Sequence, residues 1–203
     1  MFTGITRGTF PVVRVERKPD LVRYAIALPP ELLAGLARGA SVAVDGVCQT
    51  ATEFDGQQVW FDAIRETVDR TTLGDLAVGR RVSIERSYKI GDELGGHEVA
   101  GHVTGVGRIE RVNRRGDVYD LHIGVAAAWM KYILPKGFIA VDGSSLTIGS
   151  TGASGFDVHL VPETLRLTNL GEKAVGSAVN IELDARTVAI VDTVERVLAA
   201  RGL

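Results

Sequence analysis

Two short polar motifs contain the residues best suited to chemistry. DGVCQT at 45–50 recurs as DGSSLT at 142–147, with Cys48 and Ser145 at equivalent places. Asp-Gly is a common turn, and a lone cysteine is often a small buried hydrophobic residue, so a purely structural reading is open. A thiol or hydroxyl at the same place in both motifs is not needed for the turn. It predicts two related binding sites.

Two histidines lie in the segment GGHEVAGH. His97 and His102 are five positions apart, so a strand would put their imidazoles on opposite faces, which argues against a metal pair. Two partly exposed strand histidines are the simpler reading. The preceding glycines favour a functional one, because glycine lets a ligand approach the backbone. The sequence has no cysteine pair and no phosphate-binding or dinucleotide-binding glycine motif, so we expect neither a metal nor a cofactor.

A third polar motif also occurs twice, as ETVDRT at 66–71 and ETLRLT at 163–168. Its polar groups could line the mouth of a barrel and bond a polar heterocycle. Equally, the Glu-Thr pair could cap a short helix or turn. Both interpretations stay open at this point.

All three sets of residues lie within or beside an internal repeat. Laying residues 1–86 on 98–183 without a gap gives 23 identical pairs among 86. Every repeated stretch is separated from its partner by 97 positions, as in AVDGVCQT and AVDGSSLT, RETVDRTTLG and PETLRLTNLG, AVGRRVSIE and AVGSAVNIE. A gap-free match of this length indicates duplication. We therefore expect two homologous domains, 1–97 and 98–186, followed by a tail at 187–203.

Short apolar runs of period two fill each copy, such as Tyr24/Ile26/Leu28 and Val82/Ile84, and glycine-containing turns separate them. This pattern predicts about six short strands per copy. A small closed antiparallel barrel suits so many short strands, because closure removes exposed sheet edges. Two short helical pieces are also expected, at 29–39 and 126–137.

The tail predicts a helix, because apolar residues recur along 185–202 at helical spacing. The stripe consists of Ile190, Val191, Val194, Val197 and Leu198. An apolar stripe needs a cover, which is either the same chain or other copies in an oligomer.

The composition excludes several classes of partner. A net charge of −2 gives no electrostatic reason to expect nucleic acid or an anionic membrane. No apolar run approaches the roughly 18 residues of a membrane-spanning helix. The start MFTGITRGTF does not look like a signal peptide, and the single cysteine fits a reducing compartment. These features favour a cytoplasmic protein.

Together, the motifs resemble the alpha-type riboflavin synthases over essentially the whole chain. The stretches that carry the resemblance are MFTGI, ASVAVDGVCQT, ETVDRTTLGDL, GGHEVAGHV, YILPKGFIAVDGSSLTI, VHLVPETLRLTNLG and VNIELD. The resemblance implies an all-β fold of two tandem six-stranded antiparallel Greek-key barrels with a C-terminal α-helix. It also implies a homotrimer in which these helices associate, and lumazine synthase as a candidate partner.

The family's reaction converts two molecules of 6,7-dimethyl-8-ribityllumazine into riboflavin and 5-amino-6-(D-ribitylamino)uracil by transfer of a four-carbon unit. It needs no metal or cofactor, because the 7-methyl group of the substrate is itself acidic. The protein's main task is then to hold two flat heterocycles in register. Each active site would take two substrate molecules, where unlike barrels of neighbouring subunits meet.

The resemblance also assigns site residues. Those expected to act in the chemistry are His102, Cys48, Ser145, Thr147 and Asp142, with Phe2 positioning one ring. Ser145 or Cys48 would assist addition of a nucleophile, and His102 would shuttle a proton. The N-terminal barrel would bind one lumazine through Cys48, Gln49, Thr50, Asp62, Ala63, Ile64, Arg65, Glu66 and Thr67. The other lumazine would contact Gly101, His102, Val103, Ser145, Leu146, Thr147, His159, Leu160, Val161, Pro162, Glu163 and Thr164, while Gly4, Ile5, Thr6 and Lys136 would complete the pockets.

Two departures and two rival functions accompany this resemblance. Gln49 stands where the family usually has leucine, and Thr104 where many members have aspartate. A non-catalytic carrier similar to the lumazine proteins is the alternative, but such carriers tend to lose the C-terminal motifs that this chain keeps. A purely structural barrel would leave the paired polar motifs unexplained.

Overall fold

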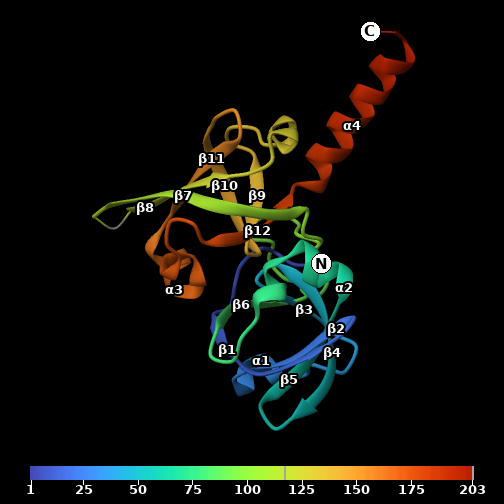
Figure 1. The fold of residues 1–203 in the computed structure, drawn as a ribbon, viewed down its shortest axis with the longest axis vertical. Coiled ribbons are helices and arrows are strands. Elements are labelled where there is room, and N and C mark those ends of the chain that lie inside the picture. The colour runs from blue at the N-terminus through green and yellow to red at the C-terminus, as the bar shows by residue number, and fades with distance from the viewer. Residues whose placement is uncertain (117, 203) are drawn as a thin grey trace.

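The computed structural model describes residues 1–116 and 118–202 as two barrels and a long C-terminal helix that leads away from them (Figure 1). The first half contains β1 (Thr9–Lys18), β2 (Leu21–Ala27), α1 (Pro30–Leu33), β3 (Ser41–Val44), β4 (Val47–Asp55), β5 (Gln58–Ile64), α2 (Arg65–Arg70), the 3₁₀ turn η1 (Thr72–Asp75) and β6 (Arg81–Arg86). The second half contains β7 (Gly105–Arg115), β8 (Val118–Gly124), η2 (Ala127–Tyr132), β9 (Phe138–Val141), β10 (Ser144–Thr151), β11 (Gly155–Leu160), α3 (Pro162–Leu167), η3 (Asn169–Glu172), β12 (Ala178–Leu183) and α4 (Ala185–Ala200).

Each half is a closed six-stranded antiparallel barrel. The first has the strand order β1-β2-β5-β4-β3-β6 and closes where Thr9 pairs with Ser83. The second has the same order in its equivalent strands and closes between β7 and β12. Strands β3, β4 and β5 follow one another through hairpins while β6 returns beside β3, which is a Greek key. The predicted fold class is confirmed.

The bulges of the barrels are duplicated along with the strands. In β1 the register shifts between Val12 and Arg14, and in β7 it shifts between Ile109 and Arg111, the equivalent residues. The bulge lets Val12 and Val15, three positions apart, both pack against the core. A bulge therefore belongs to the ancestral unit and sets which side chains enter the barrel.

The two short helices expected at 29–39 and 126–137 are smaller than predicted. The first is a single turn at α1, because the chain takes a positive φ of 68° at Gly35. The second is only the 3₁₀ turn η2. Helices α2 and α3, in contrast, contain the repeated Glu-Thr pairs in their first turns, but Ile64 and Val161 stand at their N-caps and no side chain caps either helix. The Glu-Thr pairs therefore do not act as caps, and Thr71 and Thr168 at the end of each motif cap the following turns η1 and η3 instead.

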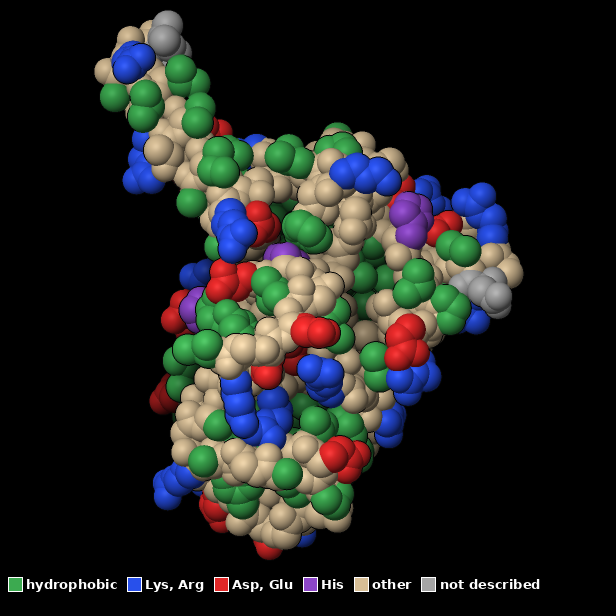
Figure 2. All heavy atoms as spheres, turned by 180° about the vertical axis from the view of Figure 1, so that it is seen from behind, with side chains coloured by type: hydrophobic (Ala, Val, Ile, Leu, Met, Phe, Trp, Pro, Cys, Tyr) green, Lys and Arg blue, Asp and Glu red, His purple; other side chains and the backbone are tan. Residues whose placement is uncertain are grey.

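The predicted C-terminal helix is present as α4, which begins after Asp184, whose carboxylate accepts a hydrogen bond from the Thr187 backbone N–H at 3.0 Å. The helix contacts the second barrel through Lys131, which pairs with Asp192 and Glu195, and through Tyr132, whose hydroxyl donates to Asp192. Apolar side chains line the free part of the helix (Figure 2). The exposed members of the stripe are Ile190, Val194, Val197 and Leu198. Within the described residues, no helix is both long and apolar enough to cross a membrane.

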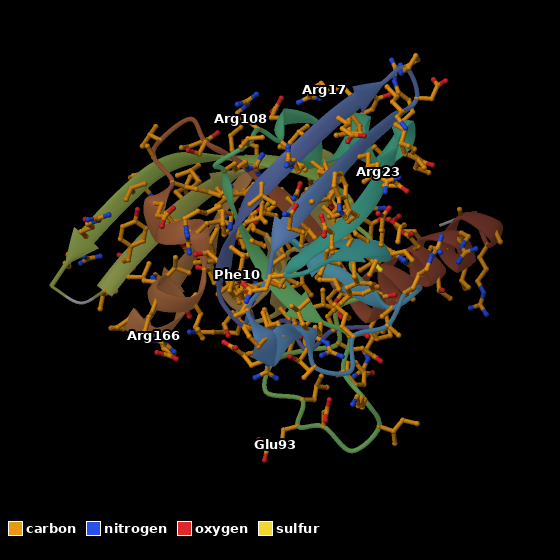
Figure 3. The ribbon with its side chains drawn as sticks, turned by 90° about the horizontal axis from the view of Figure 1, so that it is seen from below. Phe10, Arg17, Arg23, Glu93, Arg108 and Arg166 are labelled. Carbon is orange, nitrogen blue, oxygen red and sulfur yellow. The ribbon has the colours of Figure 1, made fainter. Side chains whose placement is uncertain are left out.

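The segment that joins the barrels runs from 87 to 104 and contains no strand. Its first part, around Glu93, loops away from both barrels, whereas Arg17 and Arg23 mark the outer side of the first barrel (Figure 3). The predicted strand around His97 and His102 is therefore wrong. Glycines at 91, 95, 96 and 101 suit a loop better than a strand.

The barrels meet at a seam built from their two Asp-Gly turns. Asp45 and Asp142 both have positive φ, at 44° and 45°, as a tight hairpin turn requires. A Cβ on Gly46 would lie 2.3 Å from the Gly143 backbone nitrogen, so the two turns touch backbone to backbone. The repeated Asp-Gly pairs are thus explained by the packing of one copy on the other.

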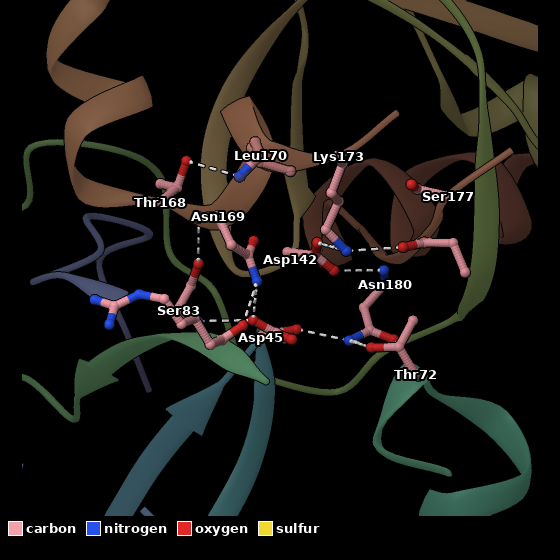
Figure 4. Close-up of polar contacts among 12 residues, drawn as sticks. Asp45, Thr72, Ser83, Asp142, Thr168, Asn169, Leu170, Lys173, Ser177 and Asn180 are labelled. Carbon is pink, nitrogen blue, oxygen red and sulfur yellow. Dashed lines mark hydrogen bonds and ion pairs between the residues drawn. The ribbon is translucent and has the colours of Figure 1, made fainter. Parts of the chain in front are cut away.

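Buried polar side chains complete the seam (Figure 4). The Asp45 carboxylate accepts hydrogen bonds from the Ser83 backbone N–H at 2.7 Å and from the Asn169 amide at 2.9 Å, and it pairs with Arg80 at 2.9 Å. Burial, together with the nearby Asp142 carboxylate, raises the pKa of Asp45 to about 6.

Candidate functional site

Two extended arms, residues 1–8 and 98–104, run along the seam and carry part of each site. They pair with each other at equivalent positions: the Phe2 N–H donates to the Val99 carbonyl at 2.7 Å, and the Val99 N–H donates to the Phe2 carbonyl at 3.0 Å. The Phe2 side chain is fully buried between the barrels in a small apolar cluster. The arms are thereby fixed relative to both barrels.

A pair of equivalent buried glutamates holds the arms. Glu85 on β6 accepts hydrogen bonds from the Thr3 backbone N–H and hydroxyl, both at 2.7 Å. Glu182 on β12 accepts from the backbone N–H groups of Ala100 at 2.7 Å and Gly101 at 2.9 Å. Burial raises the pKa of both carboxyl groups. Each barrel thus grips the arm that precedes its own first strand.

The far side of each arm touches the other barrel. The Ser145 backbone N–H donates to the Gly4 carbonyl at 2.8 Å, and a Cβ on Gly4 would lie 2.5 Å from the Ser145 Cβ. In the other copy the Cys48 N–H donates to the Gly101 carbonyl at 2.9 Å, and a Cβ on Gly101 would lie 2.6 Å from the Cys48 Cβ. Glycine is required at both places, because any side chain would displace the strand that bears the reactive group.

A hollow of about 170 Å³ opens beside Ser145. It is formed by the first arm, the start of β10 and helix α3. Its lining residues are Gly4, Ile5, Thr6, Ser144, Ser145, Val161, Glu163, Thr164, Leu167 and Thr168. Seven of these were predicted from the sequence: Gly4, Ile5, Thr6, Ser145, Val161, Glu163 and Thr164. Only the last four belong to the set predicted for the second lumazine, so the structure brings part of that set together around one cavity.

His97 lies directly against Ser145 at this hollow. Its Nδ1 is 2.6 Å from the Ser145 Oγ, and its backbone N–H donates to the same oxygen at 3.1 Å. The imidazole stacks on Phe138, with 5.2 Å between the ring centres. Gly96 permits this approach, since a Cβ there would lie 2.6 Å from the Ser145 Cβ. Burial lowers the pKa of His97, although Asp184 opposes the shift.

The N-terminal site has the same plan with different groups. Cys48 is half-buried beside Gly101, the next residue His102 is exposed, and Val103 packs against the core of the first barrel. Beyond them β5 ends at Ile64, which is 57% exposed, as Val161 is at 59% in the equivalent place. Helix α2 follows and carries Arg65, Glu66 and Thr67.

The grouping of the predicted residues needs one correction. Gly101, His102 and Val103 were assigned to the Ser145 site, but the structure places Gly101 against Cys48 and puts Gly4 against Ser145. The arms reach the barrel of the other copy, which the linear order of the motifs does not reveal. Each site therefore combines residues of both repeats.

Several predicted residues lie outside the hollow. Asp142 is buried at the seam, where its carboxylate accepts from the Asn180 N–H and pairs with Lys173, both at 2.8 Å. Gln49 faces the interior of the first barrel instead of a pocket wall, as its equivalent Leu146 does in the second. The remaining members are buried at Ala63 and Leu160, half-buried at Asp62, and exposed at Thr50, Lys136, Thr147, His159 and Pro162.

Sequence reasoning left out several residues that the structure places at the arms or the hollow, among them Leu167 and Thr168. Glu85 and Glu182 had a signal, because the motif that ends in glutamate recurs in both repeats. Ser144 had a weaker one, as a second hydroxyl next to Ser145; its Oγ lies 3.3 Å from the Thr6 Oγ1. His97 was noticed but not chosen, because its position in the joining segment gave no indication of a contact 48 residues away.

Fold and site define a duplicated two-barrel protein in which the arm of the first copy and the second barrel enclose a hollow beside Ser145. The sequence model of the lumazine-binding domain matches it twice, over residues 3–87 and 100–184. Riboflavin synthase of Escherichia coli (strain K12) is 48% identical over 202 residues, which cover 99% of this chain and 95% of that protein. The chain therefore belongs to the riboflavin synthase family of duplicated lumazine-binding proteins.

Solved structures agree with this assignment. LumP complexed with riboflavin is similar with a TM-score of 0.85 and 26% identity, covering 91% of this chain and all (100%) of LumP. LumP complexed with 6,7-dimethyl-8-(1'-D-ribityl) lumazine gives a TM-score of 0.83 and 25% identity, covering 91% and 99%.

Proposed function

We propose that this chain is a riboflavin synthase. It takes two molecules of 6,7-dimethyl-8-ribityllumazine and moves a four-carbon unit from one to the other. The acceptor becomes riboflavin, and the donor leaves as 5-amino-6-(D-ribitylamino)uracil, so all atoms of the two substrates are accounted for. This is the final step of riboflavin biosynthesis.

The observation that carries the proposal is the pair of sites built on one plan with different reactive groups. A reaction between two identical molecules needs two similar pockets, and it also needs them to treat their occupants differently. Cys48 beside Gly101 and Ser145 beside Gly4 meet both needs. The 48% identity to the Escherichia coli enzyme supports the same activity, and the LumP complexes support the class of ligand.

The proposed roles follow from where the side chains lie. Ser145 and Cys48 are half-buried at equivalent places in the two sites, and Thr147 and Thr50 follow on the outer faces of the same strands. His102, exposed next to Gly101, can move a proton at the Cys48 site. Asp142 and Phe2 are buried, so they act as positioning residues: Asp142 fixes the turn before Ser145, and Phe2 backs Gly101 and Cys48.

The assembly proposed for this activity is a homotrimer in the cytoplasm. Four apolar residues of α4 are at least 42% exposed, so the helix has an apolar surface that other copies can cover. Association of three helices would bring the first barrel of one subunit against the second barrel of another. Removing residues 187–203 should convert the trimer to a monomer in analytical ultracentrifugation, and an unchanged sedimentation profile would contradict this role. Lumazine synthase is a candidate partner, and co-sedimentation of the two proteins tests it.

Mixing the purified chain with the lumazine tests the activity directly. Riboflavin absorbance should grow while two lumazine molecules disappear for each riboflavin formed. Tight fluorescent binding without any riboflavin would instead indicate a carrier like LumP. Failure to bind the lumazine at all would reject both functions.

A further inference from the structure

Ser145 differs from every other hydroxyl of the hollow in having two groups of one residue directed at its oxygen. The backbone N–H of His97 donates to the Oγ at 3.1 Å, and the imidazole Nδ1 lies 2.6 Å from it. The oxygen has one hydrogen to donate and two lone pairs to offer. The backbone N–H uses one lone pair. The direction of the second contact therefore decides what Ser145 can offer to a ligand.

The Ser145 hydroxyl can donate to His97. The Oγ and Nδ1 atoms are 2.6 Å apart, within hydrogen-bond distance, and the tautomer of the ring sets the direction of the bond. Burial of the imidazole lowers the pKa of His97, which favours the neutral ring and leaves one nitrogen free to accept. With Nδ1 as that acceptor, the Ser145 hydrogen points at the imidazole, and the remaining lone pair of the oxygen is left for a ligand in the hollow.

We propose that His97 is the positioning residue of the C-terminal site: it holds the Ser145 hydroxyl proton, so that Ser145 acts toward the ligand as a hydrogen-bond acceptor. This inference rests on the proposed function for the identity of the ligand. A ribityllumazine can donate from its ring N–H and from its ribityl hydroxyls. Ser145 therefore selects one of these donors, and a carbonyl oxygen of the ring is turned away from it.

The Cys48 side chain in the N-terminal site has no histidine that orients it, as far as the described residues show. In the described part of the chain, no imidazole is bonded to the Cys48 side chain, and His102 beside it is exposed. His97 comes from the segment that joins the repeats and not from the repeat itself. The two substrate molecules therefore meet an oriented serine in one site and an unpaired thiol in the other.

Protonation of His97 should reverse the preference of Ser145. A charged imidazole donates from Nδ1, which turns the serine hydrogen toward the hollow. The charged group that faces His97 is Asp184 at the start of α4, while β9 presents the uncharged Phe138 and β10 presents Ser145. Binding should thus weaken as the pH falls through the pKa of His97.

Three variants of the full chain test this. His97→Asn keeps an acceptor near the Nδ1 position and does not titrate, so it should bind 6,7-dimethyl-8-ribityllumazine about as wild type does at pH 7.5 and lose the weakening at low pH. His97→Phe keeps the stack on Phe138 but removes the acceptor, so binding and turnover should each fall about tenfold, as expected for one lost hydrogen bond. In a Ser145→Ala background, His97→Phe should have no further effect.

His122→Asn is the matched control, because His122 lies on the outer face of the second barrel and bonds Asp157. It should leave the affinity and its pH profile unchanged. Equal losses from His97→Phe with and without Ser145 would overturn the proposal, as would a His97→Asn pH profile identical to that of wild type. Binding is measured without turnover, so a chain that binds lumazine but forms no riboflavin would reject the enzyme function and still test His97.

Discussion

The two barrels use equivalent residues at the seam between them but different residues at their sites. At the seam, each copy contributes an Asp-Gly turn in the same conformation, and Glu85 and Glu182 grip the two arms in the same manner. At the sites, Cys48 occupies the place that Ser145 has in the other copy, and among the described residues an imidazole is bonded to Ser145 but not to Cys48. The residues that pack the two copies together are therefore the same in both, whereas the residues at the two sites differ. Changes at the seam should therefore act equally in both copies, whereas changes at the sites should not.

Alanine at the seam glycines should produce the largest effect. A Cβ on Gly46 would lie 2.3 Å from a backbone nitrogen, and one on Gly143 would lie 2.7 Å from a backbone carbon. Both glycines also have a positive φ, which strains any other residue. The clash and this strain together should make Gly46→Ala and Gly143→Ala each lower the free energy of unfolding by about 4 kcal/mol. Chemical denaturation measures this. Gly56→Ala is the control, since its φ is also positive but nothing lies nearby, and it should cost about 1 kcal/mol. Unequal losses at Gly46 and Gly143 would break the equivalence of the seam.

Asp45 should make stability depend on pH. Its pKa is about 6 in the folded chain and about 3.9 when unfolded, so the folded state binds more protons between these values. Its contribution is present below about pH 4 and is lost as the pH rises through 6. Relative to Asp45→Asn, wild type should lose up to about 3 kcal/mol between pH 4 and 7. Unfolding curves at several pH values measure the difference, and parallel curves for the two proteins would refute the raised pKa.

The equivalent substitutions at the two reactive positions should separate the sites. Ser145→Ala removes a hydroxyl that is oriented by His97, and it should lower turnover about a hundredfold and ligand affinity about tenfold. Cys48→Ala removes an unoriented thiol and should have a smaller effect. Stopped-flow turnover and equilibrium titration measure both. Equal losses of turnover and affinity in Ser145→Ala would make Ser145 a binding residue only.

Gln49 should give the smallest change. It lies in the interior of the first barrel, where the second barrel has Leu146, and its amide nitrogen donates to the Cys48 carbonyl at 2.9 Å while its buried amide oxygen has no protein partner among the described residues. Gln49→Leu should therefore raise the free energy of unfolding by about 1 kcal/mol. Thermal unfolding measures it. A destabilised variant would mean that the Cys48 carbonyl needs this donor.

Most of the fold could be predicted from the sequence, because the 97-residue offset and the period-two strands can both be seen in the order of the residues without knowing any contact. The seam could not, since Asp45 and Asp142 look like ordinary turn residues until the two turns are packed together. The grouping of the sites failed for the same reason. Residues 98–104 have no periodicity of their own, and contacts with Cys48 and Glu182 decide their path. His97 was noticed but not assigned to a site, because its partner Ser145 is remote in sequence.

The crossing of the arms has a consequence for the origin of the protein. Each arm is gripped by its own barrel but completes the site of the other, which is the arrangement of a domain-swapped dimer whose two chains have been joined. Two half-chains made separately should each form a barrel, and neither would contain a complete site until they complement one another. The segment that joins the two repeats also supplies His97, which contacts Ser145. A symmetric dimer of a single-repeat ancestor would have had the same residues in both of its sites, so it could not have placed such a histidine in one site alone.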